Sequence, residues 1–213
     1  MQGILNLGNN NHHKTNDFVV SHSNFEAYNI ILNWKRWQNK RLLIIGPPKS
    51  GKTSLARIWQ KNTEAIFLNA NAIDTENIKH NKAIIIDNIE HFRESGLINL
   101  INFANEKSLS LLLTSTKYPS FSLKDLNSRI RATYQAIIKE PDEQLLKLLI
   151  IRLFTQRQIR VSEKIVNFIF SNIERNYESA YRVVKLVDET SKTEKRNVTT
   201  PFIRSVVAEY YKV

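Results

Sequence analysis

One eight-residue string constrains this chain more than any other: residues 46–53 read Gly-Pro-Pro-Lys-Ser-Gly-Lys-Thr, a complete G-x-x-x-x-G-K-T pattern. An apolar, strand-like run precedes the string and a predicted helix, Thr53–Gln60, follows it. This is the strand–loop–helix setting that the pattern requires, in which a curled backbone aims successive N–H groups at phosphate oxygens. The chain has only five glycines in 213 residues, so a chance match in the right setting is improbable.

The pattern therefore predicts a phosphate-binding loop for ADP or ATP; the alternative is a turn that happens to fit. Lys52 is expected to reach the β- and γ-phosphates, and the Thr53 hydroxyl is expected to ligate Mg²⁺. The predicted nucleotide contacts in this loop are Gly46, Pro47, Pro48, Lys49, Ser50, Gly51, Lys52 and Thr53.

A second candidate site is an apolar run, Ala83–Ile86, that ends in the carboxylate of Asp87. A strand-end aspartate placed after the loop suits a residue that holds Mg²⁺ through water; the alternative is a carboxylate in an ordinary turn. Many ATPases carry a glutamate directly after this aspartate to polarise the attacking water. Here that residue is Asn88, whose amide cannot accept a proton, and Glu90 points elsewhere if the chain bends after the strand. The sequence predicts at most weak intrinsic ATPase activity.

Strand-like runs alternate with helical stretches between residues 42 and 138. The predicted strands are Leu42–Ile45, Ala65–Leu68, Ala83–Ile86, Leu111–Thr114 and Tyr134–Ile138. The predicted helices include an amphipathic segment before Trp37 and the segments Thr53–Gln60, Leu97–Glu106 and Leu123–Ile130. Alternation of buried-type strands with helices is typical of an α/β fold whose parallel sheet is covered on both faces.

The pattern changes near Pro141. Apolar residues then recur at i, i+3 and i+4 without a strand signal, in residues 142–157, 161–173, 177–190 and 200–211. The sequence therefore predicts a flexible arm (1–16), a nucleotide-binding domain (17–140) and a small helical domain (141–213).

Composition narrows the class of protein further. The formal net charge of +11 is compatible with nucleic-acid contact, but the charges are scattered and a generally lysine-rich composition explains them equally well. The absence of cysteine excludes a disulfide scaffold, a thiolate metal site and a cysteine nucleophile. No apolar run approaches the ~18–20 residues of a membrane helix, and no signal-peptide pattern begins the chain. We expect a cytoplasmic protein without membrane association.

The order of the motifs resembles the AAA+ ATPases of the bacterial replication-initiator family, the DnaA/Hda family, and most of all its shorter, Hda-type members. The resemblance covers roughly residues 17–211. Besides the loop, it rests on Asp17-Phe-Val-Val-Ser, Asp87-Asn-Ile-Glu90, Leu113-Thr-Ser-Thr116 and Leu126-Asn-Ser-Arg129-Ile. It implies a AAA+ P-loop NTPase core, with a five-stranded parallel sheet and helices on both faces, followed by an all-α lid.

The resemblance also assigns roles to single residues. Thr114 and Ser115 fall where the family places sensor 1, a polar group beside the γ-phosphate; the alternative is a strand end and turn. Arg129 falls on the arginine-finger position, which completes the active site of a neighbouring subunit and contributes ~10³–10⁵ in rate in such enzymes. The alternative for Arg129 is a solvated arginine at a helix end.

Sensor 2 is the position where this chain departs from the family pattern. The family places an arginine at the start of the third lid helix, and Glu178 occupies that position here. Arg175 and Arg182 lie three and four residues away, on nearby helical faces, and either could contact phosphate instead. Two solvated arginines are the equally weighted alternative.

The N-terminal arm carries one further motif. Gln2, Leu5 and Leu7 resemble the Q-x-x-L-x-L peptide by which bacterial proteins dock on the replicative sliding clamp, with Gly3 in place of the usual leucine. Short extended peptides bind in this way through alternate side chains. His12, His13 and His22 could be taken for metal ligands, but no carboxylate or cysteine completes a set, so we expect a solvated arm.

These features predict a nucleotide-binding regulator of chromosome replication initiation. Tethered to the sliding clamp, it promotes hydrolysis of ATP on a DnaA-type initiator through Arg129 acting in trans. The alternatives are a DNA-acting AAA+ ATPase, such as a helicase loader or truncated initiator, and a non-catalytic adaptor. DNA contact is expected to be indirect or weak, and homo-oligomer formation stays open.

Overall fold

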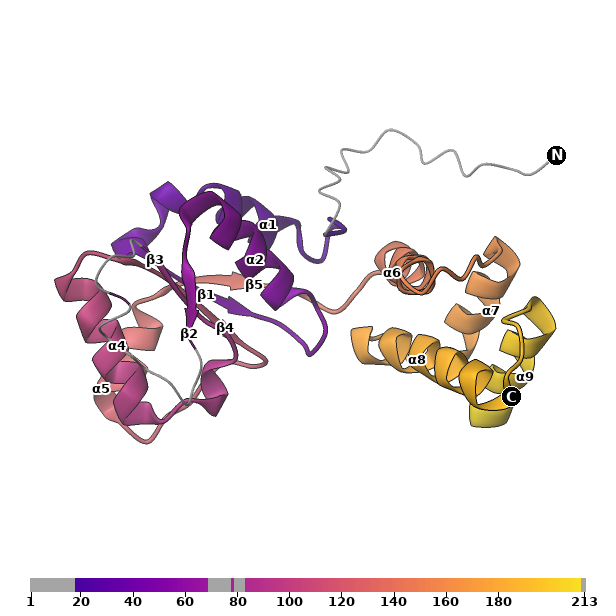
Figure 1. Ribbon diagram of the computed structural model, residues 1–213. Helices are drawn as coiled ribbons and strands as arrows, with labels where there is room; N and C mark the ends of the chain where they lie inside the picture. The colour runs from indigo at the N-terminus through magenta and orange to yellow at the C-terminus, as the bar shows by residue number, and fades with distance from the viewer. Residues whose placement is uncertain (1–17, 69–77, 79–82, 212–213) are drawn as a thin grey trace.

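The computed structural model describes residues 18–68, 78 and 83–211, and shows two lobes joined by a short link (Figure 1). The first lobe is built on five parallel strands in the spatial order β2-β3-β4-β1-β5. Leu42 in the central strand β1 lies opposite Leu112 of β4 on one side and Tyr134 of β5 on the other. The strands are β1 (Arg41–Ile45), β2 (Ile66–Leu68), β3 (Ala83–Ile86), β4 (Ser110–Ser115) and β5 (Tyr134–Ile137).

Helices cover both faces of this sheet because its strands are apolar on both sides. Leu42 and Ile44 pack in one core with α1 (Phe25–Leu32) and α2 (Lys52–Thr63). Leu43 and Ile45 point the other way and pack with α4 (Glu94–Glu106) and α5 (Lys124–Arg131). Short 3₁₀ turns complete the lobe: η1 (Trp34–Arg36), η2 (Gln38–Lys40) and η3 (Ile89–His91). The predicted α/β fold is confirmed.

The boundaries of α4 differ from the prediction for a physical reason. The helix begins at Glu94, three residues before the predicted start at Leu97. Its first turn is Glu94-Ser95-Gly96, which contains no apolar side chain, so hydrophobic spacing cannot reveal it.

The second lobe consists of four helices around one apolar core: α6 (Glu143–Thr155), α7 (Glu163–Asn172), α8 (Tyr177–Glu194) and α9 (Thr200–Tyr211). Side-chain caps fix two of the helix starts. Asp142 Oδ1 accepts a hydrogen bond from the Leu145 N–H at 2.7 Å, and Asn176 Oδ1 accepts one from the Ser179 N–H at 2.8 Å. The predicted helical segments correspond to these four helices, and the lobe has the form of the helical lid that the resemblance implies.

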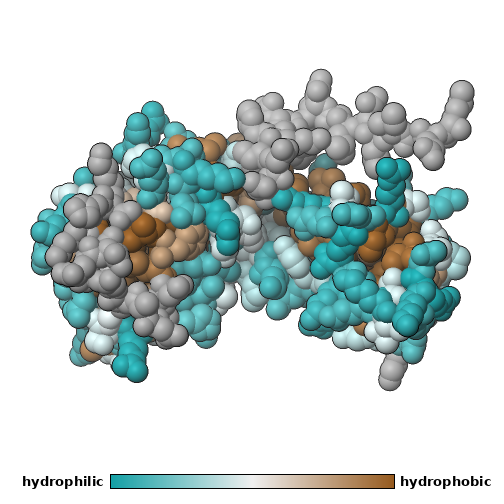
Figure 2. All heavy atoms as spheres, viewed as in Figure 1, coloured by the Kyte–Doolittle hydropathy of each residue, from teal (hydrophilic) through white to brown (hydrophobic). Residues whose placement is uncertain are grey.

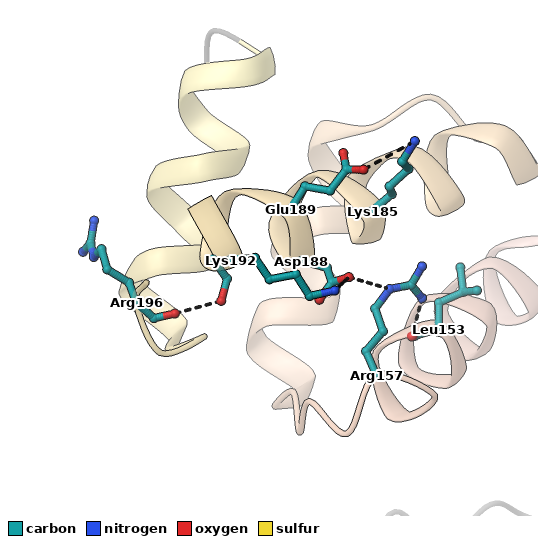
Figure 3. Close-up of polar contacts among 8 residues, drawn as sticks. Leu153, Arg157, Lys185, Asp188, Glu189, Lys192 and Arg196 are labelled. Atoms are coloured by element: carbon teal, nitrogen blue, oxygen red, sulfur yellow. Dashed lines mark hydrogen bonds and ion pairs between the residues drawn. The ribbon is translucent and has the colours of Figure 1, made fainter. Parts of the chain in front are cut away.

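Ion pairs on α8 join it to the preceding connection (Figure 3). Asp188 of α8 accepts from Lys192 Nζ at 2.8 Å and lies 3.6 Å from Arg157 Nε. Arg157 follows α6 and also donates to the Leu153 carbonyl at 2.9 Å. Asp188 therefore ties the end of α6 to the middle of α8, whereas Lys185 and Glu189 pair at 3.5 Å on the exposed surface of α8 alone.

The link between the lobes is hydrogen-bonded to both. Lys139 donates its N–H to the Ser23 carbonyl at 2.9 Å, and its own carbonyl accepts from the Tyr177 hydroxyl at 3.0 Å. Leu145 and Tyr177 of the second lobe pack into the core under α1 and α2. Figure 2 shows hydrophobic side chains in both lobes, with hydrophilic ones over the rest of this face. None of the described helices is long and apolar enough to span a membrane.

Candidate nucleotide-binding site

The G-x-x-x-x-G-K-T string forms the loop between β1 and α2, at the carboxyl end of the central strand. Two of its residues have left-handed backbone: Lys49 at φ 62° and Gly51 at φ 97°. A Cβ at position 51 would lie 2.7 Å from the Phe18 ring, so only glycine fits there. α2 begins at Lys52, and the first N–H groups of a helix have no acceptor within it, so they are available to an anion.

Lys52 is held inside the loop. Its ammonium donates to the carbonyls of Gly46 at 2.7 Å and Pro47 at 2.9 Å, and the residue is 5% exposed. Burial lowers the pKa of Lys52 below its ordinary 10.5, while the negative charges of Glu90 and Asp87 oppose that shift. The lysine therefore faces both carboxylates from within the loop.

The hydroxyl of Ser50 indicates whether the loop suits a phosphate ligand. The residue is 3% exposed, and among the described residues its Oγ has no hydrogen-bond partner. A buried hydroxyl without a partner is costly unless something else satisfies it. Together with the helix N-terminus and the glycine-only contact at Phe18, this orphaned hydroxyl fits a phosphate group at the loop.

Asp87 joins the loop to the neighbouring strands. Its Oδ2 accepts from the Thr53 hydroxyl at 2.7 Å, and its Oδ1 accepts from the Thr114 hydroxyl at 2.5 Å. The Thr114 hydroxyl in turn accepts from the Asn88 N–H at 2.8 Å. The structure thus brings together Thr53, Asp87 and Thr114, which the sequence analysis placed in three separate motifs.

Oxygen donors of this kind suit Mg²⁺, because hard cations prefer carboxylate and hydroxyl ligands. Thr53 and Asp87 are the two residues predicted to hold the metal, and they are hydrogen-bonded to each other. The described part of the chain contains no group of three or more His, Cys, Asp or Glu side chains that could hold a metal by itself.

The two residues predicted for sensor 1, Thr114 and Ser115, make different contacts. The Thr114 hydroxyl contacts Asp87. The Ser115 hydroxyl instead donates to the Lys117 carbonyl, two residues further along the chain, at 2.6 Å. The Ser115 carbonyl accepts from the Gly46 N–H at 3.2 Å, so Ser115 supports the loop through its backbone.

Glu90 lies in a different place from the one expected. The chain does bend after β3, with Asn88 at φ 56°, but the Glu90 carboxylate turns back toward the site. Its Oε1 accepts from the Thr116 N–H at 2.9 Å and from the Thr116 hydroxyl at 2.7 Å. Burial raises the pKa of Glu90, but hydrogen bonds from Thr116, from its own backbone and from Ser115 together outweigh burial and leave the pKa below its ordinary 4.5. Glu90 thus adds a second negative charge facing Lys52.

Arg129 lies at the opposite end of the sheet from the loop. It is in the last turn of α5, which leads into the start of β5, and its guanidinium pairs with Asp125 at 3.1 Å. Arg41 is the first residue of β1, and its pKa is lowered by burial and then by the positive charge of Arg129. The two guanidinium groups are therefore neighbours. The loop follows the last residue of β1, about 16 Å further along the strand. Arg129 is not placed to reach the loop of its own chain.

A hollow between the loop and the second lobe completes the site. Phe18, Lys49, Ser50, Gly51 and Ser54 line it from the first lobe. The second lobe contributes one face of α6 and the start of α8, namely Leu145, Leu149, Arg152, Leu153, Gln156, Tyr177 and Tyr181. The Lys49 ammonium lies 5.7 Å from the centre of the Tyr181 ring.

Neither candidate for sensor 2 lines this hollow. The Arg175 guanidinium lies 5.3 Å from the centre of the Phe170 ring. Burial raises the pKa of Tyr211, and the positive charge of Arg182 opposes this, so Arg182 faces the end of α9. The arginine that does line the hollow is Arg152 of α6, which sequence reasoning missed because the family pattern directs attention to α8.

The predicted clamp-binding residues Gln2, Leu5 and Leu7 lie outside the described residues, as do Asp17, His12 and His13.

Comparisons with known proteins agree with this geometry. Residues 142–207 match the family model described as Hda, lid domain. Over 186 residues the chain is 27% identical to an uncharacterized protein of Haemophilus influenzae, covering 77% of this chain and 80% of that protein.

Two solved structures share the fold. Domain III of the Thermotoga maritima replication initiation protein DnaA matches with a TM-score of 0.72 and 18% identity, covering 93% of this chain and 96% of that one. AMPPCP-bound DnaA from Aquifex aeolicus matches with a TM-score of 0.64 and 14% identity, covering 84% and 68%. The fold is that of a AAA+ core with a helical lid, and the family model identifies the lid. The whole chain therefore has the fold of DnaA domain III, and its second lobe matches the Hda lid-domain model.

Proposed function

We propose that this protein binds ADP or ATP with Mg²⁺ in the loop between β1 and α2. The observation that carries this proposal is the intact loop, with a buried Lys52 and an orphaned Ser50 hydroxyl beside it. Lys52 would exchange the carbonyls of Gly46 and Pro47 for phosphate oxygens, while Thr53 and Asp87 hold Mg²⁺. The magnesium ion supplies neutralising charge on the phosphates when bound. The remaining predicted loop contacts, Pro48, Lys49 and Gly51, belong to the same proposal, and Ser115 enters it by supporting the loop through its carbonyl.

Intrinsic turnover of the nucleotide is proposed to be weak. Asn88 stands where a glutamate would polarise the attacking water, and its amide cannot take a proton. Glu90 carries the nearest additional carboxylate, but two hydrogen bonds from Thr116 hold it. A base held in this way, with a lowered pKa, is a poor proton acceptor.

We further propose that Arg129 acts as an arginine finger in trans, on ATP bound by a DnaA-type initiator. Two observations support this role: Arg129 lies at the end of the sheet away from its own loop, and the lid belongs to the Hda family model. Its partner Asp125 is exposed, so the guanidinium can leave that ion pair for a phosphate at modest cost. The protein would then regulate initiation negatively, by converting initiator–ATP to initiator–ADP.

The arm completes the proposal: Gln2, Leu5 and Leu7 would tether the protein to the sliding clamp in the cytoplasm, where the initiator and DNA meet. Its support is the Q-x-x-L-x-L pattern alone.

Turnover of initiator-bound ATP tests the trans role. Addition of the wild-type protein with clamp is expected to stimulate hydrolysis, and Arg129→Ala is expected to reduce the stimulation by ~10³ or to the background rate. Arg131→Ala is the matched control, since it removes an exposed arginine from the same helix. Equal stimulation by wild type and Arg129→Ala, or no stimulation at all, overturns the role.

The clamp tether is tested separately by a clamp pull-down. Wild type should be retained, and the double variant Leu5→Ala/Leu7→Ala should not. Retention of both proteins would contradict the tether and leave the trans role of Arg129 unaffected.

A further inference from the structure

The hollow between the loop and the lid carries a charge pattern that points to one residue. Among the described residues that line it, the cations are Lys49 and Arg152, and none is a carboxylate. Lys49 is exposed and directed at the Tyr181 ring. Arg152 is therefore the one cation that the lid contributes to the wall of this hollow.

The position of Arg152 follows from the face that α6 turns toward the loop. Leu145, Leu149, Arg152 and Gln156 recur at intervals of three and four residues, which places them on one side of a helix. The two leucines pack toward the first lobe and fix that side. Arg152 is held on the same side by this packing and is partly buried.

Arg152 also borders a second hollow that runs along α2. Ser54, Arg57, Gln60 and Lys61 line this groove with it, and its volume is about 380 Å³. Ser54, in the first turn of α2, lines both hollows with Arg152. Arg152 therefore borders α2, the helix whose N-terminus faces the phosphate site, from its first turn onward.

We propose that Arg152 is the lid's contact with the phosphates of the bound nucleotide, in place of an arginine on α8. This inference rests on the proposed nucleotide binding. The start of α8 presents Tyr177 and Tyr181 to the hollow, and Glu178 occupies the family's sensor 2 position. A guanidinium on α6 supplies the missing positive charge from a neighbouring helix. Such a contact would require bound phosphate and would add to the packing of Leu145 and Tyr177 that already joins the lobes.

Fluorescent ADP titrations test the proposal. Arg152→Ala is expected to weaken ADP and ATP binding by about 10- to 100-fold, the range for loss of a charge-assisted hydrogen bond. Arg152→Lys is expected to recover part of that affinity, because it keeps the charge but loses the planar fork. Adenosine, added as a competitor, should bind wild type and Arg152→Ala equally, since it has no phosphate for the arginine to contact.

Arg175→Ala and Arg182→Ala are the matched controls, and each is expected to change the affinity for ADP less than about twofold. If Lys52→Ala loses ADP binding but Arg152→Ala keeps it, the assignment of Arg152 is wrong and the proposed nucleotide site stands. An equal loss for adenosine also overturns the assignment, because Arg152 would then act through packing. If the wild type binds no nucleotide, both the site and the assignment fail.

Discussion

Among single residues, Thr114 is the one that ties three parts of the site together. Its hydroxyl donates to Asp87 at 2.5 Å and accepts from the Asn88 N–H at 2.8 Å, and Asp87 in turn holds Thr53. Thr114 is fully buried, so no water replaces a bond that is removed. The geometry of the predicted metal ligands depends on this one hydroxyl.

Thr114→Val should therefore destabilise the protein by ~1–3 kcal/mol, because it leaves the Asn88 N–H and one Asp87 oxygen without a partner. Urea denaturation measures the change. Thr155→Val is a control of the same chemistry, since the Thr155 hydroxyl donates to the Ile151 carbonyl at an exposed position of α6. That variant should cost less than ~0.5 kcal/mol. Similar losses for both variants would contradict the role given to Thr114.

Glu90 gives a pH-dependent prediction. Its pKa in the folded protein is below the ordinary 4.5, so the ionised form is favoured by folding. The stability contributed by its charge is fully present above the ordinary pKa and is lost as pH falls through the folded pKa. Wild type should exceed Glu90→Gln in stability above about pH 5 by less than ~1 kcal/mol, since the residue is exposed. A difference that stays constant as the pH is lowered to about 3 would contradict this.

At the scale of elements, the loop between β1 and α2 depends on one backbone conformation. Gly51 has φ 97° and leaves no room for a Cβ beside Phe18. Gly51→Ala should destabilise the fold by ~1–3 kcal/mol through backbone strain and this contact. Lys49→Gly makes the opposite change at a left-handed position of the same loop and should cost less than ~1 kcal/mol. Thermal unfolding of both variants makes the comparison, and equal losses would be inconsistent with the strain at Gly51.

The lid offers a second prediction at this scale. Asp188→Asn weakens contacts with both Arg157 and Lys192 and should destabilise the protein by ~0.5–1 kcal/mol. Glu189→Gln removes the exposed pair with Lys185 only and should have an effect near zero. Chemical denaturation measures both variants. A larger loss from Glu189→Gln than from Asp188→Asn would show that the Arg157 contact contributes nothing.

The sequence predicts elements better than it predicts contacts between them. The strands β1, β3 and β4 were recognisable because parallel strands buried on both faces are largely continuous apolar runs, whereas β5, Tyr-Gln-Ala-Ile, is a more exposed edge strand. The position of Glu90 was missed because it depends on how the turn after Asn88 directs a side chain. Arg152 was missed for a similar reason, because its place in the hollow depends on which side of α6 faces the loop. The hydrophobic spacing of one helix does not show how two lobes pack against each other. Thr114 and Ser115 could not be separated because both lie at the end of β4, where neighbouring side chains point to opposite faces of the sheet, and the sequence does not say which face meets Asp87.

For the whole molecule, the proposed nucleotide bridges two apolar cores. All three tryptophans, at positions 34, 37 and 59, belong to the first lobe, so their fluorescence reports on that lobe, whereas far-ultraviolet circular dichroism reports on both. Excess ADP at about 100 times its Kd should stabilise the fold by about 2.7 kcal/mol. The two signals should then change at the same, raised temperature.

Lys52→Ala supplies the control for this experiment. It removes the ammonium predicted to hold phosphate, so ADP should no longer raise its unfolding temperature. An equal shift in wild type and Lys52→Ala would mean that ADP stabilises the protein from some other place.

Because Arg129 and the phosphate loop lie at opposite ends of the sheet, the two ends of the molecule differ in what they can offer a neighbouring chain. One end of the sheet carries a guanidinium and the other carries the loop, so a two-fold dimer that brought like ends together would complete no site. If Arg129 acts on a neighbour's phosphate as proposed, its end of the sheet must meet the loop end of that neighbour, and repeating this contact in one direction gives a head-to-tail column of chains. A chain that stacks at the end of such a column supplies its arginine to one neighbour and leaves its own loop uncovered. In the proposed role, such a terminal chain would act on its neighbour's nucleotide without depending on hydrolysis at its own loop.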